Sequence, residues 1–415
     1  MGMPICTQQA SRKKLNQRVT AMITGSGPLS RQASRHVWLQ ADISTILCSQ
    51  DIARRPPGFY FAQIMSSDFT PMIKPITLGS GKHQVTLSQP VILAPLSGVT
   101  DLPFRALVKE QGAGLVVSEM IASWAMVREN RKTLCMAEVV SGGGPSSVQL
   151  AGCDPQAMAE AAKIAVGLGA DLIDINFGCP VKKVAIGQLA GSSLMRDEAL
   201  AGRILEATAR AVEVPVTLKM RMGWDHNSLN APNLARIAEQ SGIQMLTVHG
   251  RTRQQFYEGV ADWDFIANVK AATRLPVIVN GDITTEQKAE EALRRSGADG
   301  VMIGRGSYGR PWFLRQVIHY LTTGETISAP SLAVQKEILL NHYRAVRSYF
   351  GEGAGVRLGR KHVAWYSQGL RGSAAFRAAM NRMDDGLAVE ALVHQFYDPL
   401  IEQGFVRQDE LALAA

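Results

Sequence analysis

The stretch LIDINFGCPVKKVAIGQLAG, residues 172–191, joins an apolar strand-like run to a polar loop. Leu172, Ile173 and Ile175 are apolar, and isoleucine favours β-structure. The loop after it holds Asn176, Cys179 and two consecutive lysines. In a barrel of parallel strands, reactive side chains lie at the carboxyl ends of the strands. The stretch therefore predicts one barrel strand and makes Cys179 a candidate reactive residue.

Seven further short apolar runs flank this strand, separated by Ala-rich amphipathic segments such as 155–167, 198–212, 231–240 and 285–295. Such alternation is typical of βα units and a parallel sheet, and eight units predict an α/β fold of the (β/α)8 TIM barrel type. A doubly wound open sheet competes, but residues 94–99 lack the glycine-rich loop it requires. The eight runs are Val91–Leu96, Leu115–Ser118, Ser147–Leu150, Leu172–Asn176, Val216–Met220, Met245–His249, Val277–Asn280 and Gly300–Gly304.

Beyond Pro330 the strand pattern stops, and apolar stripes predict helices over 333–350, 357–370, 374–382 and 388–402. Residues 1–64 lack periodicity and carry most of the formal charge of +8. We expect residues 1–64 to be disordered, or an extension upstream of the true start at Met65. The barrel is predicted over 65–328, and a helical bundle domain over 329–410.

The composition is that of a globular protein, with 46% hydrophobic and 19% charged residues. No apolar run approaches the length of about 20 residues that spans a membrane. The five cysteines are irregularly spaced, which argues against a disulfide framework and a CxxC metal site. We therefore expect a cytoplasmic protein with no metal and no membrane contact.

Cys179 lies between Gly178 and Pro180, just beyond a strand end. An ordinary thiol has a pKa near about 8.5, so it can serve as an acid when protonated or as a nucleophile when ionised. Both roles stay open from the residues alone, and the structural alternative is a small buried hydrophobe. The position at a strand end favours a function.

The last two strands end in glycine-rich loops, Asn280-Gly281-Asp282 and Gly304-Arg305-Gly306. Such a pair of loops predicts a phosphate site, although the glycines could simply form tight turns. Lys219 could stabilise negative charge on a reduced flavin or form a Schiff base. His249 could be a site residue or a structural histidine.

Several motifs in order resemble those of tRNA-dihydrouridine synthases, most closely the bacterial B-type branch. The similarity runs from about residue 70 to about residue 400 and is specific to the ordered set. The motifs are APLSGVTDLPFR at 94–105, SEM at 118–120, VQL at 148–150, IDINFGCP at 173–180, TLKMR at 217–221, VHGRTR at 248–253, NGDI at 280–283, IGRG at 303–306 and RKHVAWY at 360–366.

The resemblance implies an enzyme with FMN that uses NADPH, or NADH, to reduce the C5–C6 double bond of specific uridines in tRNA to 5,6-dihydrouridine. Hydride would reach C6 from the flavin, and Cys179 would donate the proton to C5. The uridine would be extruded from the RNA to reach the barrel mouth. We expect a monomer.

The resemblance also implies residue roles. The cofactor-binding set would be Pro95, Leu96, Ser97, Gln149, Lys219, His249, Asn280, Gly281, Asp282, Gly304 and Arg305. Asn176 and Arg251 would bind the uracil. From their charge, we expect a further set of basic residues to contact the RNA phosphates, unless they are ordinary solvated charges; these are Lys182, Lys183, Arg357, Arg360, Lys361 and His362. One departure is the segment from Cys179 to Gly191, which is one residue longer than in most members of the family.

Two alternatives stay open. One is an FMN barrel oxidoreductase that acts on a free pyrimidine, as dihydroorotate dehydrogenase does, but such an enzyme has no use for a basic helical domain. The other is a non-catalytic RNA-binding protein on the same scaffold, which would have no need of Cys179, Lys219 and Arg305.

Overall fold

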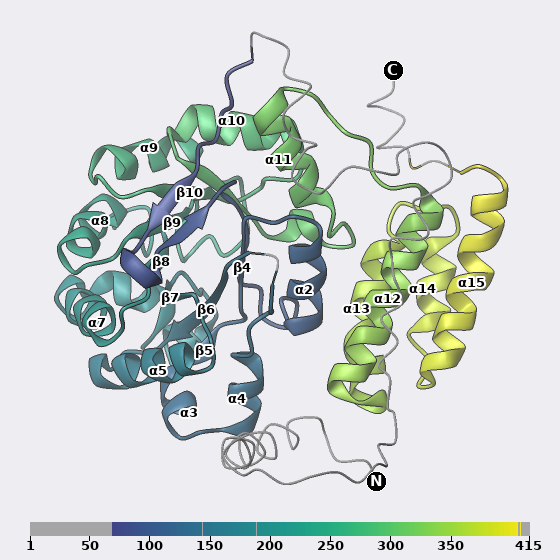
Figure 1. Ribbon diagram of the computed structural model, residues 1–415, viewed down its shortest axis with the longest axis horizontal. Helices are drawn as coiled ribbons and strands as arrows, with labels where there is room; N and C mark the ends of the chain where they lie inside the picture. The colour runs from purple at the N-terminus through teal and green to yellow at the C-terminus, as the bar shows by residue number, and fades with distance from the viewer. Residues whose placement is uncertain (1–68, 143, 188, 406, 408–415) are drawn as a thin grey trace, which may run out of the picture. The chain divides into compact units, whose positions relative to one another are not determined.

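The computed structural model describes residues 69–142, 144–187, 189–405 and 407 (Figure 1). The prediction for residues 1–64 lies outside these residues. Within the described part of the chain, eight parallel strands run in the order β4-β3-β11-β10-β9-β8-β7-β6, and β4 pairs with β6 to close the ring. The predicted (β/α)8 barrel is confirmed. Its strands are β3 (Val91–Leu93), β4 (Leu115–Val117), β6 (Ser146–Ala151), β7 (Leu172–Phe177), β8 (Val216–Arg221), β9 (Met245–His249), β10 (Val277–Asn280) and β11 (Gly300–Ile303).

The pairing register of the strands sets polar residues side by side at their carboxyl ends. Asn176 of β7 lies opposite Lys219 of β8, and His249 of β9 lies opposite both Arg221 and Asn280. Because side chains alternate between the two faces of a strand, Lys219 and Arg221 share a face. The barrel thus gathers these side chains at one rim.

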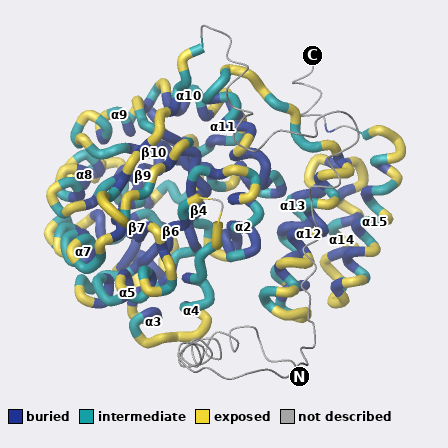
Figure 2. The backbone as a smooth tube through the Cα atoms, in the orientation of Figure 1, coloured by how far each residue is buried: buried dark blue, intermediate teal, exposed yellow. Residues whose placement is uncertain are grey.

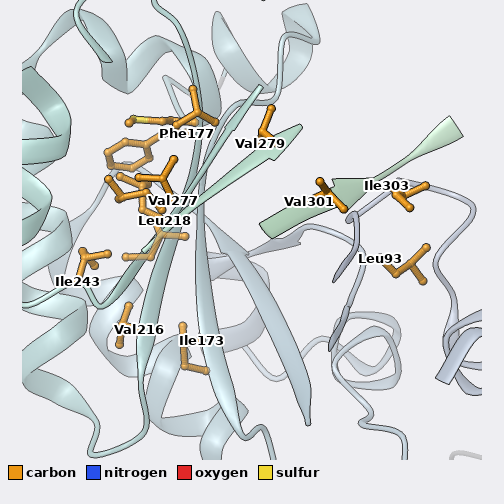
Figure 3. Close-up of a cluster of buried hydrophobic side chains, with 14 of the residues drawn as sticks. Leu93, Ile173, Phe177, Val216, Leu218, Ile243, Val277, Val279, Val301 and Ile303 are labelled. Atoms are coloured by element: carbon orange, nitrogen blue, oxygen red, sulfur yellow. The ribbon is translucent and has the colours of Figure 1, made fainter. Parts of the chain in front are cut away.

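The strands are buried on both faces, as the dark blue centre of Figure 2 shows. Apolar side chains such as Ile173, Phe177 and Leu218 pack between the strands and the surrounding helices (Figure 3). Several of these helices begin with side-chain caps; for example, Asp154 accepts a bond from Ala157 N at 2.7 Å. The helices are α2 (Leu102–Glu110), α3 (Ser123–Val127), α4 (Arg131–Met136), α5 (Pro155–Gly167), α6 (Lys182–Ala185), α7 (Glu198–Ala211), α8 (Ala231–Gln240), α9 (Trp263–Ala271), α10 (Glu286–Ser296) and α11 (Phe313–Thr323).

Shorter elements complete this part of the chain. β1 (Ile76–Leu78) and β2 (Val85–Leu87) form an antiparallel pair, and β5 (Ile121–Ala122) extends β6. Three short 3₁₀ helices are η2 (Gly81–His83), η3 (Gly191–Arg196) and η4 (Arg305–Ser307). Of these, η3 follows the Cys179 loop directly.

Four helices follow the barrel and share an apolar core that includes Tyr343, Tyr366 and Tyr397. They are α12 (Leu332–Phe350), α13 (Glu352–Tyr366), α14 (Ser373–Met380) and α15 (Gly386–Glu402). The helix predicted over 357–370 is observed as α13, which begins five residues earlier than predicted and ends four residues earlier.

The early start of α13 is explained by its glycines. A Cβ on Gly355 would lie 2.4 Å from Arg347 Cα, and a Cβ on Gly359 would lie 2.6 Å from the Tyr343 ring. Glycine normally weakens a helix, but here it lets α13 approach the backbone of α12. Tertiary packing thus outweighs the intrinsic preference.

Aromatic and polar contacts join these helices to the barrel. His342 and His362 lie 5.4 and 5.5 Å from the ring of Phe104 in α2. Trp365 stacks on Tyr308 at 4.1 Å, and Tyr349 donates to Glu138 at 3.1 Å. Within the described ranges, no helix is long and apolar enough to cross a membrane, and no group of three or more His, Cys, Asp and Glu could hold a metal ion.

Candidate active site

A cavity of about 600 Å³ opens at the carboxyl ends of the barrel strands. Its volume suits a cofactor or small ligand, because such sites measure about 300–1,000 Å³. Thirteen of the residues predicted from the sequence contribute to its lining: Pro95, Leu96, Ser97, Gln149, Asn176, Cys179, Lys219, His249, Asn280, Gly281, Asp282, Gly304 and Arg305.

A chain of hydrogen bonds fixes the loop that carries Cys179. The Oδ1 atom of Asn176 accepts bonds from the backbone N–H groups of Gly178 and Cys179, at 3.1 and 2.9 Å. Since a backbone N–H can only donate, the amide oxygen of Asn176 must face the loop. Its Nδ2 therefore faces inward and donates to Gln149 Oε1 at 2.7 Å.

This series of hydrogen bonds ends at the buried carboxylate of Asp174. Gln149 Nε2 donates to Asp174 Oδ2 at 2.7 Å, and Thr217 Oγ1 donates to Asp174 Oδ1 at 2.6 Å. Asp174 is only 3% exposed, and burial raises its pKa against the effect of these two bonds. Each amide in the chain keeps one N–H hydrogen for a ligand. Asp174 thus sets the orientation of the Gln149 amide, in agreement with the orientation that the loop N–H groups set for Asn176.

The surroundings of the Cys179 thiol favour its protonated form. Burial raises its pKa, although the Val181 backbone amide and the positive charges of Arg221 and Lys219 oppose the shift. Ser192 anchors the loop, because its N–H and Oγ both bond to the carbonyl oxygen of Cys179, at 3.2 and 2.8 Å. A neutral thiol can donate a proton and is a weak nucleophile.

Lys219 lines the cavity. Burial and the neighbouring charge of Arg221 lower its pKa to about 8. Its Nζ donates to Asn280 Oδ1 at 3.0 Å, and Asn280 Nδ2 donates to Met302 O at 2.8 Å. The ammonium group is therefore fixed between two strands, where a ligand with partial negative charge would meet it.

His249 is neutral in this site. Burial, followed by the charges of Arg221 and Lys219, holds its pKa well below 6.5. Arg251 Nη1 lies 3.3 Å from His249 Nε2. Because a guanidinium only donates, Nε2 accepts and the ring proton lies on Nδ1.

Arg251 lies beneath the cavity lining and is only 1% exposed. It binds both carboxylate oxygens of Asp282, at 3.0 and 2.7 Å, and donates to the carbonyls of Glu258 and Gly259. The uracil contact predicted for Arg251 is therefore not available in this arrangement. The residue instead fixes Asp282, whose backbone has the unusual φ of 56°.

Gly281 is required by close contact with His249. Its φ is +118°, and a Cβ there would lie 2.7 Å from Ala261 Cβ and 2.8 Å from His249 Cδ2.

Gly281→Ala is expected to lower the free energy of unfolding by about 3 kcal/mol, from overpacking and backbone strain together. Urea unfolding measures this loss. Gly297→Ala is the matched control, because the φ of Gly297 is +63° but a Cβ there would meet no atom within 4 Å from described residues outside its own turn. It should cost only about 1 kcal/mol, and equal losses would contradict the steric explanation.

The far end of the cavity offers donors for an anion. Arg305 is half exposed there, at 49%, with Nη2 3.3 Å from Asp282 Oδ1. Ile283 and Thr284 line the same cavity, and their backbone N–H groups have no acceptor among the described residues. Together with Gly304 and Gly306, this donor set is suited to a phosphate group.

The residues predicted to contact the RNA backbone fall into three groups. Lys182, Lys183 and Arg357 are exposed and form no ion pair with any described residue. Arg360 pairs with Asp384 at 2.7 Å, and Lys361 donates to the carbonyl of Gly98.

His362 differs from the expectation, because it is only 3% exposed and burial holds its pKa well below 6.5. It packs between the barrel and the helices, as a neutral ring rather than a cation available to phosphate.

Two further residues line the cavity: Arg221, which the sequence places at a strand end in the motif TLKMR but to which no role was given, and Tyr257, which was not predicted. Arg221 donates to the carbonyls of Gly178 and Thr252, both at 2.8 Å, and burial lowers its pKa to about 10. Its place two residues after Lys219 on one strand was the available signal. Tyr257 is 52% exposed, and Arg305 Cζ lies 5.0 Å from its ring. Tyr257 lies in an irregular loop, where no periodicity of the sequence indicates which way a side chain points.

Fold and cavity together define a (β/α)8-barrel enzyme whose reactive groups lie at the carboxyl ends of the strands. Residues 92–398 match the family described as "Dihydrouridine synthase (Dus)". The chain belongs to the dihydrouridine synthase family.

Relatives agree with this assignment. The chain is 57% identical to a "Probable tRNA-dihydrouridine synthase" of Rickettsia conorii, over 78% of this chain and 98% of that protein. It is 51% identical to "tRNA-dihydrouridine synthase B" of Xanthomonas campestris, over 76% of this chain and 95% of that protein. For the protein of the same name in Pseudomonas putida, the identity is 49% and the coverage 76% and 93%. The predicted resemblance to this family, including its B-type members, is confirmed.

Proposed function

We propose that this protein reduces specific uridines of tRNA to 5,6-dihydrouridine with bound FMN, using NADPH or NADH as the electron donor. The observation that carries the proposal is that Cys179, whose thiol pKa is raised by burial, lines the same cavity as Lys219, in a chain of the dihydrouridine synthase family. The reaction would take place in the cytoplasm.

The cavity fits FMN in two respects. Arg305 and the unpaired amides of Ile283 and Thr284 form a donor set for its phosphate. Lys219, Gln149 and the apolar wall of Pro95 and Leu96 suit a flat ring that carries negative charge when reduced. When bound, the flavin would supply hydride for C6 of the uracil.

Within this proposal, Cys179 donates a proton to C5 of the uracil. Uracil accepts hydride at C6 because the C5–C6 bond is conjugated to the C4 carbonyl, which leaves negative charge to be protonated at C5. The raised thiol pKa keeps that proton available at neutral pH. The remaining amide hydrogen of Asn176 would bind a uracil carbonyl, and Arg221 and Tyr257 would flank the base.

RNA would approach the rim of the cavity. Lys182 and Lys183 follow the Cys179 loop directly, and Arg357 projects from α13 without an acidic partner among the described residues. These exposed cations suit phosphate contacts. Lys361 and Arg360 would join them only by exchanging their present partners.

The purified protein should carry a flavin absorbance and oxidise NADPH when supplied with undermodified tRNA. Product is measured as dihydrouridine in the digested RNA. Because the cations lie outside the cavity, free uracil is expected to react at least about 10²-fold more slowly, having lost the binding energy of the RNA. Turnover of free uracil alone would favour the free-pyrimidine enzyme, and a colourless protein would favour the non-catalytic one.

A further inference from the structure

We propose that Arg253, Arg196 and Trp224 form a binding site for a backbone phosphodiester of the RNA, beside the nucleotide that enters the cavity. The inference rests on the proposed function, since it adds a second contact to the same substrate. None of the three residues was among the predicted RNA contacts.

Arg253 is a buried guanidinium without a counter-ion among the described residues. It is 8% exposed, and its Nε and Nη2 atoms are buried without a hydrogen-bond partner among the residues that the structure describes. Its Cζ lies 4.7 Å from the ring of Trp224 and 5.1 Å from that of Phe256. The rings hold the planar cation in place, but they do not neutralise it.

A second cation lies against the same tryptophan. Arg196 Cζ lies 4.8 Å from the Trp224 ring, and the residue is exposed. Neither arginine takes part in any ion pair found within the part of the chain that the structure describes. Glu198 accepts from Asn230 at 2.8 Å and Asp225 accepts from Asn227 N at 3.0 Å, and neither carboxylate forms an ion pair with Arg196 or Arg253 in the described part of the chain.

The cluster lies on the rim where the cavity opens. Arg196 ends η3, whose Ser192 anchors the carbonyl of Cys179 at 2.8 Å. Arg253 N donates to Gly223 O at 3.0 Å, which ties the loops after β9 and β8 together. Thr252, next to Arg253, accepts a bond from the cavity residue Arg221. The cluster therefore adjoins the cavity without contributing to its lining.

An anion is the ligand class that this arrangement requires. Burying an unpaired cation costs free energy that a counter-ion returns. A guanidinium binds phosphate oxygens by charge-assisted, directional bonds. An extruded nucleotide brings phosphodiesters to this rim on either side of its sugar, so the RNA itself supplies the counter-ion.

The test measures binding of a labelled unmodified tRNA transcript to the flavin-loaded protein over a series of KCl concentrations, without NADPH. Arg253→Met and Arg196→Met should each weaken binding roughly tenfold at low salt. Each should also reduce the slope of log affinity against log salt by about one. Arg253→Lys keeps the charge and should keep the slope.

Arg295→Met is the matched control. Arg295 also lies over a tryptophan, 5.4 Å from Trp263, but it is paired with Asp264 at 2.6 Å and Glu291 at 3.1 Å. Its replacement should leave both affinity and slope unchanged. Arg196 is exposed, so Arg196→Met tests the charge even if Arg253→Met unfolds.

Wild-type slopes in both Arg196→Met and Arg253→Met would overturn the inference and leave the pair as a structural clamp. A raised KM for NADPH with unchanged tRNA binding would also overturn it, because the anion would then be the phosphate of the nucleotide. If the wild-type protein fails to bind or reduce tRNA at all, the proposed function itself is wrong. Reduction by the wild type with unaffected variants contradicts only this site.

Discussion

Replacement of Cys179 by alanine is expected to leave flavin content and tRNA affinity unchanged while uridine reduction falls by about 10²-fold or more. The thiol touches the cavity, but the groups suited to hold the flavin lie elsewhere, at Lys219 and Arg305. Single-turnover reduction of undermodified tRNA, normalised to bound flavin, measures the loss.

Cys179→Ser is the matched variant, because a hydroxyl keeps the shape of the thiol but is a much weaker acid. It should be nearly as inactive as alanine. Loss of flavin with normal activity per bound flavin would show that Cys179 is not the proton donor.

The pH dependence of Cys179 alkylation gives a second test of the role of the thiol. Burial raises the thiol pKa, so the protonated form persists through neutral pH and ionises only in more alkaline solution. The rate of alkylation by iodoacetamide should therefore be low at neutral pH and rise later than for an exposed cysteine. Fast alkylation at neutral pH would indicate a thiolate and would favour a nucleophilic role.

Gln149→Glu is expected to disturb the Cys179 loop severely. It would set a second carboxylate against Asp174, across a contact that is now 2.7 Å, in a place where Asp174 is 3% exposed. Two buried carboxylates in contact either share a proton or repel each other. The loss of stability should reach about 3 kcal/mol when both are ionised, and it should shrink as the pH falls, since a proton restores one donor.

Adding Asp174→Asn to Gln149→Glu is expected to restore the loop. The amide introduced at position 174 can donate to the carboxylate introduced at position 149, while its oxygen still accepts from Thr217. That carboxylate can still accept from Asn176, as the amide oxygen of Gln149 does now. Alkylation of Cys179 and urea unfolding of the single and double variants measure the recovery.

The single and the double variant share the change at position 149. Any difference between them in stability or in Cys179 alkylation is therefore caused by the change at position 174. No recovery in the double variant would contradict the orienting role of Asp174.

Sequence patterns predicted the strands because burial on both faces leaves a strong mark on composition. Leu172–Asn176, Met245–His249 and Val277–Asn280 match observed strands to within a residue. Their registers then bring Asn176, Lys219 and His249 together without further information. The residues expected from the motifs at strand ends therefore lie together around one cavity, at the carboxyl ends of the strands.

Residues in irregular segments were harder to place, because their surroundings come from distant parts of the chain. Arg251 is turned inward by the carboxylate of Asp282, and His362 is covered by Phe104. Neither partner can be identified from local sequence. Arg253 is similar, since Trp224 and Phe256 enclose it.

The close approach of α13 to α12 also fixes the distance between these two helices. Side chains in an ordinary helix interface can repack when one residue changes. At Gly355 and Gly359, however, a helix surface with no side chain of its own meets Arg347 Cα and the Tyr343 ring. No larger residue fits there without moving one of the helices. The exposed side chain of Arg357 therefore extends from a helix whose distance from α12 is set by Gly355 and Gly359.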